Sequence, residues 1–381
     1  MKLALPAVVA LLVATATCSG DDDIEPSVPE PGAAASSSPP ASGTPSGAST
    51  AGTPSVSPKP PDLTPETVAR GFEVPWGIAF LPDGSSIVAE RESGTIQRLD
   101  PGGGVREVGA VPGVAPTSEG GLLGLAVSPS YEQDRTVFAY LTTDDDNRVV
   151  TMSYDGRRLG RAEPILTGIP AGAIHDGGRI AFGPDGMLYV TTGESGDEQI
   201  AQDPDSLGGK ILRIEPDGSV PSDNPDPKSP VWTLGHRNVQ GLAWDDAGRL
   251  WATEFGSNTW DELNLIKPGR NYGWPAAEGK ADLDGLTDPV TQWSTGAASP
   301  SGVAFVDGSL WVAGLRGEQL WQVPVRADGS VGEPKAHFSG EYGRLRTVVA
   351  TPDGGLWFTT SNRDGRGDPA DADDRVFEIR P

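Results

Sequence analysis

The chain of 381 residues repeats one pattern six times: a short apolar run, a turn, and a second run rich in aromatic or β-branched residues. Asp-Gly between two such runs predicts a hairpin, because glycine adopts the positive φ of the turn without steric strain. Six copies of this unit predict an all-β chain folded as a six-bladed β-propeller, whereas a two-sheet sandwich explains the recurrence poorly. The copies are GIAFLPDGSSIVAE (77–90), GLAVSPSYEQDRTVFAYL (124–141), RIAFGPDGMLYVTTG (179–193), GLAWDDAGRLWATE (241–254), GVAFVDGSLWVAG (302–314) and TVVATPDGGLWFTT (347–360).

Most copies continue into a third apolar run, which predicts a third strand for the blade. These runs are 95–99, 210–214, 262–266, 319–323 and 375–379. The segment 68–70 is expected to complete the last blade and so to close the ring. Residues 66–381 are therefore predicted to form the propeller domain.

The first 65 residues read as an export signal followed by a spacer. Residues 1–18 have the charged start and apolar stretch of a signal peptide, and the only cysteine, Cys18, stands where a lipoprotein signal would be cut. An ordinary secretory signal is the alternative. Residues 19–65 are rich in Pro, Ser and Ala and are predicted to be a disordered tether. We expect an extracytoplasmic protein that is lipid-anchored at the cell membrane, or alternatively secreted.

The composition excludes several classes of partner and site. A formal net charge of −24 argues against nucleic acid and against anionic membrane surfaces, because both select basic patches. Contact with a membrane is expected only through the lipid anchor. A single cysteine excludes an internal disulfide framework and a Cys-rich zinc site.

The repeat alignment predicts which residues converge on one mouth of the channel. The residues before each inner strand and those after each second strand lie on the same face of a propeller. The segments before the inner strands contain Pro75-Trp76, Glu119-Gly120-Gly121, His175-Asp176-Gly177-Gly178, His236-Arg237-Asn238, Ser299-Pro300-Ser301 and Arg344-Leu345-Arg346. The loops after the second strands add Gln199, Gly256-Ser257 and Arg316.

Four arginines and a histidine are thus expected at this mouth. Guanidinium groups bind carboxylate or phosphate in a planar fork, so Arg237, Arg316, Arg344 and Arg346 together favour an anionic ligand. A surface salt bridge is the alternative for any one of them. His175 is expected to be either a base or ligand at the mouth or a structural histidine held by hydrogen bonds.

Two acidic loops bear on metal binding. The segment 254–262 mixes carboxylates, an amide and free carbonyls, which are ligands that calcium accepts, although such loops are usually solvated. The aspartate-rich loop 364–374 is expected to be solvated rather than to hold a metal.

The chain from about residue 72 onward resembles the PQQ-dependent soluble glucose/sorbosone dehydrogenase family, which includes aldose sugar dehydrogenases. The resemblance rests on VPWGIAFLPDG, GGLLGLA, HDGGRIAFGPDG, GHRNVQGLAW, DELNLIKPGRNYGWP and RLRTVVATPDG. It implies a quinoprotein oxidoreductase on a six-bladed propeller, with pyrroloquinoline quinone (PQQ) and Ca²⁺ as cofactors. Such an enzyme oxidises an aldose at C1 to the lactone, transfers the hydride to PQQ, and passes electrons to an acceptor, here an unidentified extracytoplasmic one.

The resemblance also implies roles for individual residues. His175 corresponds to the general base, Arg237 and Asn238 to the pair at the reactive carbonyl of the cofactor, and Gln199 to a glutamine that faces the substrate. Arg344 and Arg346 match two cofactor-site arginines, of which Arg346 is assigned to the reacting centre. The remaining matches are Glu119 and Arg316 in the cofactor site, the carbonyls of Gly256 and Ser257 as ligands of the cofactor calcium, and Glu262, Tyr272 and Asp282 in a second, structural calcium site.

Three positions depart from the family pattern. Glu119 stands where a glutamine is common, and its carboxylate is expected to repel those of PQQ unless it is protonated or shares the calcium. Ile174 replaces an acid that orients the base, and Arg316 replaces a lysine. Two alternative functions remain open: a calcium-dependent lactone hydrolase, and a non-catalytic propeller that binds a ligand or partner.

Overall fold

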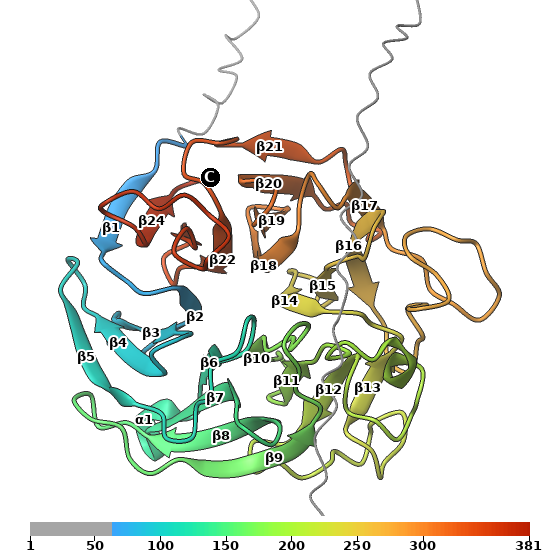
Figure 1. The fold of residues 1–381 in the computed structure, drawn as a ribbon, viewed down its shortest axis with the longest axis horizontal. Helices are drawn as coiled ribbons and strands as arrows, with labels where there is room; N and C mark the ends of the chain where they lie inside the picture. The colour runs from blue at the N-terminus through green and yellow to red at the C-terminus, as the bar shows by residue number, and fades with distance from the viewer. Residues whose placement is uncertain (1–62) are drawn as a thin grey trace, which may run out of the picture. The chain divides into compact units, whose positions relative to one another are not determined.

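Six four-stranded antiparallel sheets surround a central axis in the structure, a computed structural model that describes residues 63–381 (Figure 1). This arrangement confirms the six-bladed propeller. The signal peptide, Cys18 and nearly all of the tether lie outside the described residues. Leu63 already packs against the core, so the folded chain begins slightly before residue 66.

Each blade places its strands in chain order from the axis to the rim, except that blade 6 takes its outermost strand from the start of the described chain. Blade 1 contains β2 (Pro75–Phe80), β3 (Ser86–Glu90), β4 (Thr95–Leu99) and β5 (Val105–Ala110). Blade 2 contains β6 (Leu122–Val127), β7 (Thr136–Thr142), β8 (Asn147–Ser153) and β9 (Glu163–Ile169), with the helix α1 (Tyr131–Asp134) in its first turn. Blade 3 contains β10 (Ile180–Phe182), β11 (Leu188–Thr191), β12 (Lys210–Ile214) and β13 (Val231–Leu234), with the 3₁₀ helix η1 (Glu198–Ala201). Blade 4 contains β14 (Val239–Trp244), β15 (Leu250–Glu254), β16 (Trp260–Ile266) and β17 (Thr291–Ser294). Blade 5 contains β18 (Pro300–Val306), β19 (Ser309–Gly314), β20 (Gln319–Pro324) and β21 (Lys335–His337). Blade 6 contains β22 (Leu345–Ala350), β23 (Leu356–Thr360), β24 (Arg375–Ile379) and β1 (Glu66–Arg70).

The ring closes where the two ends of the folded chain meet. Strand β1 pairs antiparallel with β24, with Thr67 opposite Phe377 and Ala69 opposite Val376. The expected closure by residues 68–70 is therefore confirmed. The predicted third runs coincide with β4, β12 and β24 and lie within β16 and β20.

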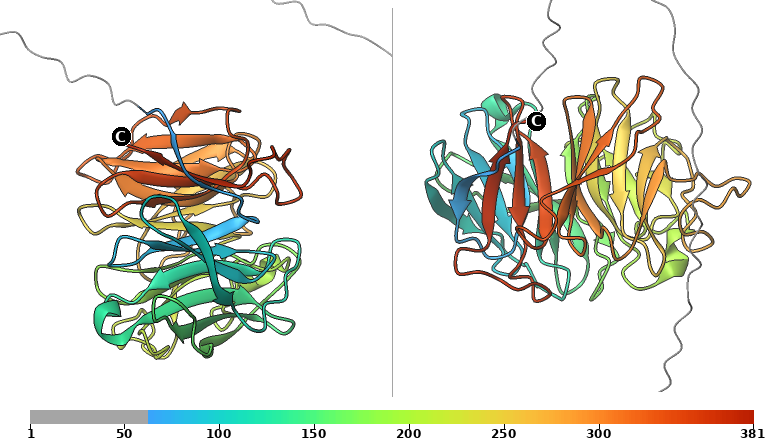
Figure 2. Two further views of the ribbon diagram at one scale, coloured as in Figure 1. Left: turned by 90° about the vertical axis from the view of Figure 1, so that its left-hand side faces the viewer. Right: turned by 90° about the horizontal axis from the view of Figure 1, so that it is seen from above.

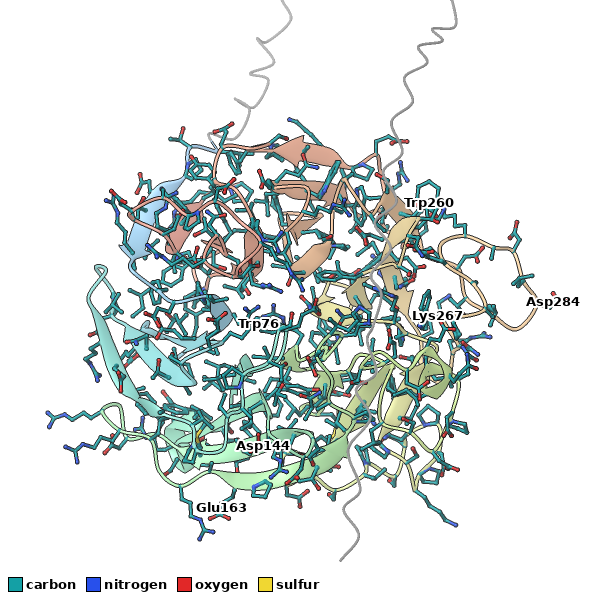
Figure 3. The ribbon with its side chains drawn as sticks, viewed as in Figure 1. Trp76, Asp144, Glu163, Trp260, Lys267 and Asp284 are labelled. Atoms are coloured by element: carbon teal, nitrogen blue, oxygen red, sulfur yellow. The ribbon has the colours of Figure 1, made fainter. Side chains whose placement is uncertain are left out.

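The hydrophobic core consists of six clusters, one between each pair of neighbouring blades. Tryptophans fill several of them: Trp251 lies between blades 4 and 5, and Trp311 between blades 5 and 6, both without exposed surface. Trp76 lies beside the centre of the ring (Figure 3). No helix within residues 63–381 is long and apolar enough to cross a membrane.

One face of the ring is organised by a backbone hydrogen bond that recurs in every blade. A residue at the end of the second strand, or shortly after it, donates its N–H to the carbonyl of a residue before the innermost strand. The pairs are Arg91 to Val74, Thr142 to Gly121, Ser195 to His175, Phe255 to Asn238, Leu315 to Ser299 and Ser361 to Arg344. These bonds fix the segments that the sequence predicts at the channel mouth. The long loop between β16 and β17 extends outward from the ring (Figure 2).

Candidate active site

His175 and Glu194 form a buried pair where the chain approaches β10 and leaves β11. Nδ1 of His175 lies 2.5 Å from Oε1 of Glu194, and the other carboxylate oxygen accepts the N–H of Gly196. A carboxylate beside Nδ1 stabilises the tautomer that carries its proton there. Nε2 then has a free lone pair, and it has no hydrogen-bond partner among residues 63–381.

Glu194 is a site residue that the sequence reasoning missed. The departure at Ile174 suggested that the base lacks an orienting acid, and the Ile174 side chain is indeed 37% exposed and apolar. The structure places the orienting acid on the other segment of the same blade, directly after the second strand. The signal was available in TTGESG at 191–196, because the loop after the second strand shares the face of His175.

The backbone conformation of His175 belongs to the propeller repeat. Its φ of 59° lies in the left-handed region, which a non-glycine residue rarely adopts. Val74 and Ser299 have φ values of 51° and 47° at the equivalent positions of blades 1 and 5. The positive φ therefore helps to place His175 at the mouth, but it recurs in other blades and is not evidence of catalysis.

Glu119 is held in its charged form between two donors. Its Oε2 accepts the N–H of His175 at 3.0 Å, and its Oε1 accepts Nη1 of Arg366 at 2.9 Å. Burial alone would raise the pKa of Glu119, but these two bonds outweigh burial and lower it. The expected repulsion of an anionic ligand by this carboxylate is thus offset by the Arg366 guanidinium.

Arg344 and Arg346 converge on one buried carboxylate, that of Asp364. Arg344 forms a bidentate pair with it at 2.9–3.1 Å, and Nη2 of Arg346 lies 3.4 Å away. The expectation that loop 364–374 is solvated holds for Asp368 and Asp371, which are exposed, but is wrong for Asp364, Asp373 and Asp374, which are buried. Burying two guanidinium groups requires a counter-charge, and the loop supplies one from 18 residues beyond Arg346.

Arg237 and Asn238 lie side by side before β14 with donors that lack partners. Nη1 of Arg237 donates to the Gly256 carbonyl at 2.6 Å, and Oδ1 of Asn238 accepts the N–H of Gly177 at 3.0 Å. Burial lowers the pKa of the Arg237 guanidinium. Nε of Arg237, Nδ2 of Asn238 and Nε of Arg346 are buried without a hydrogen bond.

These unpartnered donors test whether the site fits PQQ, which carries three carboxylates and an ortho-quinone. Three unpaired donors on residues that the resemblance assigns to the cofactor are free to bind the oxygens of a ligand. Oxygen-rich PQQ offers such acceptors. The residues present therefore fit the group.

Arg179 is a further buried cation that the sequence reasoning missed. Its Nε donates to the Gln240 carbonyl at 2.9 Å, and its guanidinium stacks 4.2 Å from the ring centre of Trp76. Burial lowers its pKa to about 9. Arg346 bonds the side chain of the same Gln240, and burial lowers its pKa to about 9 as well. Two desolvated guanidinium groups thus meet at Gln240 beside the inner strands.

Two expected site residues stand apart from this network. Arg316 follows β19 and is exposed, and Gln199 lies in η1 and is exposed. Neither side chain has a hydrogen bond or ion pair with any part of the chain between residues 63 and 381. Both remain predicted contacts to ligands at the rim.

The loop after β15 presents the carbonyls expected to bind the cofactor calcium. The N–H groups of 257–260 all point to Oε1 of Glu278, and the N–H of Gly256 donates to Oδ1 of Asp261 at 2.9 Å. Burial opposes the charge of Glu278, but the four backbone bonds lower its pKa. Ser257 has no bond at its carbonyl within the described chain. In this turn the N–H groups are bound by Glu278, and the carbonyl oxygens are the kind of ligand that a hard cation such as calcium prefers.

The residues assigned to the second calcium site make separate contacts in the described chain. Tyr272 donates its hydroxyl to the Leu265 carbonyl at 2.8 Å, and Asp282 is exposed in the β16–β17 loop. Glu262 is buried, and burial together with the charge of Glu254 raises its pKa well above its ordinary value. In residues 63–381 no three His, Cys, Asp or Glu side chains are placed to hold a metal. The second calcium site stays a prediction.

Comparisons with known proteins agree with the propeller fold and show the family of the chain. Residues 72–367 match the glucose / sorbosone dehydrogenase family. The solved structure of a PQQ-bound aldose sugar dehydrogenase from Streptomyces coelicolor is 55% identical, with a TM-score of 0.81 over 84% of this chain and 99% of that chain.

Two curated relatives are more distant. The aldose sugar dehydrogenase YliI of Escherichia coli is 29% identical over 80% of this chain and 92% of its own length. Quinoprotein glucose dehydrogenase B of Acinetobacter calcoaceticus is 33% identical over 58% of this chain and 54% of its own length. With the family match spanning most of the chain and a propeller whose mouth gathers His175, Arg237 and Arg346, the protein belongs to the glucose/sorbosone dehydrogenase family of oxidoreductases.

Proposed function

We propose that this protein is a PQQ-dependent dehydrogenase that oxidises the C1 hydroxyl of an aldose and yields the lactone. The observation that carries the proposal is the buried His175–Glu194 pair beside three buried donors that lack acceptors. When bound, PQQ supplies the hydride-accepting quinone, which no side chain can provide. The Streptomyces relative, which is solved with PQQ, supports the same reading.

His175 moves the proton in this proposal. Glu194 accepts a hydrogen bond from Nδ1–H, so Nε2 is the base that takes the proton of the C1 hydroxyl while the C1 hydride leaves. The positive charge that forms on the imidazole is stabilised by the Glu194 carboxylate. Glu119 holds the backbone N–H of His175 and thereby fixes where the ring stands.

The remaining residues bind and orient. Arg237, Asn238, Arg344 and Arg346 would hold the cofactor's oxygens, with Arg316 and Glu119 at its edge and Gln199 toward the sugar. The desolvated guanidinium of Arg346 would place positive charge beside the oxygens of the bound cofactor. The carbonyls of Gly256 and Ser257 would bind the cofactor Ca²⁺, and Glu262, Tyr272 and Asp282 a second one.

Reconstitution tests the proposal and separates its alternatives. The purified protein is expected to be inactive alone and to reduce a redox dye with an aldose after PQQ and Ca²⁺ are added. Absence of turnover with every aldose tested would refute the enzyme proposal. Lactone hydrolysis with Ca²⁺ alone would instead support the hydrolase, and absence of PQQ binding in an absorbance titration would support a non-catalytic propeller.

We also propose that the protein acts outside the cytoplasm on a lipid anchor at Cys18 and passes electrons to an extracytoplasmic acceptor. The support is the order of charged start, apolar stretch and single cysteine in residues 1–18. Mass spectrometry of the mature N-terminus tests this: a diacylglyceryl group on Cys18 is expected, and a free or absent Cys18 contradicts the anchor. The Cys18→Ser variant should lose membrane association while keeping the activity of the domain.

A further inference from the structure

One oxygen of Glu278 organises the loop that follows β15. Oε1 accepts the N–H groups of Ser257, Asn258, Thr259 and Trp260, at 2.7, 2.9, 2.9 and 3.1 Å. These are four successive backbone donors on a single acceptor, an arrangement that forms a concave site for an anion. Glu278 itself comes from the long loop between β16 and β17, so the anion belongs to the protein.

The bonds to Glu278 determine where the neighbouring carbonyls point. The C=O of Gly256 and the N–H of Ser257 belong to one planar peptide group, and so do the C=O of Ser257 and the N–H of Asn258. In a trans peptide these two groups point in opposite directions. The only cis bonds in the described chain are Trp274–Pro275 and Asp373–Asp374, so both peptides here are trans. Both carbonyls therefore point away from Glu278.

For the Gly256 carbonyl, the direction away from Glu278 is toward the candidate active site. The Gly256 carbonyl accepts Nη1 of Arg237 at 2.6 Å, and Arg237 is one of the residues at the channel mouth. An N–H bound to a carboxylate also polarises its own peptide group, which makes the carbonyl a stronger ligand for a cation. The carboxylate thus binds the N–H ends of these peptide groups, and the expected cation binds their C=O ends.

We propose that Glu278 is a positioning residue for the cofactor Ca²⁺: it holds the carbonyls of Gly256 and Ser257 in their ligand orientation before the metal binds. This inference rests on the proposed function, because it takes these carbonyls as calcium ligands. According to this proposal, the β16–β17 loop controls the affinity for calcium through Glu278, which does not itself contact the metal.

A matched pair of variants tests the charge of Glu278. Glu278→Gln keeps an oxygen acceptor but removes the charge. Asp284→Asn removes one charge from the same loop at an exposed acid that lies at the outer end of the loop, away from Trp260 (Figure 3). The readout is the Ca²⁺ concentration that half-saturates PQQ binding, followed by the absorbance of PQQ without any substrate.

The inference predicts a half-saturating Ca²⁺ concentration about tenfold higher in Glu278→Gln, because charge-assisted bonds are roughly twice as strong as neutral ones, and a value within about twofold of wild type in Asp284→Asn. Equal values for Glu278→Gln and wild type would overturn it. So would an equal rise in both variants, because the effect would then be one of net charge.

Amide hydrogen exchange on the wild-type protein gives a second test that does not depend on a variant folding. In calcium-free protein, the amides of 257–260 should exchange far more slowly than an unbonded loop. Exchange at the rate of a free loop would contradict preorganisation by Glu278. If wild type binds no PQQ at any Ca²⁺ concentration, the proposed function fails, whereas the exchange measurement still judges the role of Glu278 in holding the loop.

Discussion

Two carboxylates contact His175, and they act on different atoms. Glu194 binds Nδ1 of the ring, whereas Glu119 binds the backbone N–H. The first therefore controls the tautomer and the second the position of the residue. This division makes their substitutions distinguishable.

Replacing Glu194 by glutamine should lower kcat by about a hundredfold or more, because an amide can donate to Nδ1 and so favour a proton on Nε2, which removes the base. The PQQ dissociation constant should change little, since Glu194 is not assigned to the cofactor. Dye-linked kinetics and an absorbance titration measure the two effects. A kcat equal to that of wild type would rule out the orienting role.

Replacing Glu119 by glutamine should change stability in a pH-dependent way. The pKa of Glu119 is lowered in the folded state, so its stabilising contribution is complete above its unfolded pKa of about 4.3 and is lost as the pH falls through the folded value. Wild type should therefore melt above Glu119→Gln at neutral pH, and the two curves should converge in acid. A gap that widens as the pH falls would contradict the assigned pairing with Arg366.

Sequence alone found the segments at the mouth but not their charge partners. His175, Arg237 and Asn238 could be placed because they precede inner strands in a repeat. Arg366 could not, because it meets Glu119 across 247 residues of chain, and no local pattern reports such a contact. Asp364 lies only 18 residues beyond Arg346, but an aspartate-rich loop looks solvated in the sequence unless its buried counter-charge is known.

At the level of strands, the inner elements of each blade were predictable and the outer ones were not. The first and second strands are apolar on both faces because blades pack against each other, and β3 and β15 are buried throughout. The outermost strands β5 and β21 are mostly exposed, so they lack the apolar run from which a strand is predicted. Propeller geometry, rather than a sequence signal, requires them.

Strand β1 provides the test at this level, because it closes the ring noncovalently. A chain that starts at residue 71 lacks β1 and exposes the cluster that Ala69 shares with Val376, Ile78 and Leu99. Its melting temperature should fall by about 5 °C or more relative to a chain that starts at residue 63. Equal melting temperatures would show that β1 does not hold the ring closed.

The site exists only in the closed molecule, because four different blades contribute fragments of it. Glu119 leads into blade 2, His175 into blade 3, Asn238 into blade 4 and Arg346 stands in blade 6. The net charge of −24 therefore says little about the site, where buried guanidinium groups face an expected anionic cofactor. The composition argues against nucleic acid as a partner. Only the alignment of the repeats predicted that arginines gather at the channel mouth.

The most direct measurement of the proposed chemistry is a single turnover without an electron acceptor. Protein reconstituted with PQQ and Ca²⁺ is mixed anaerobically with an aldose, and the absorbance of the quinone is followed. Wild type should reduce its cofactor within one turnover, and His175→Ala should bind PQQ equally well but reduce it at least about a hundredfold more slowly. Reduction at the same rate in both proteins, or none in wild type with any aldose, would contradict the account.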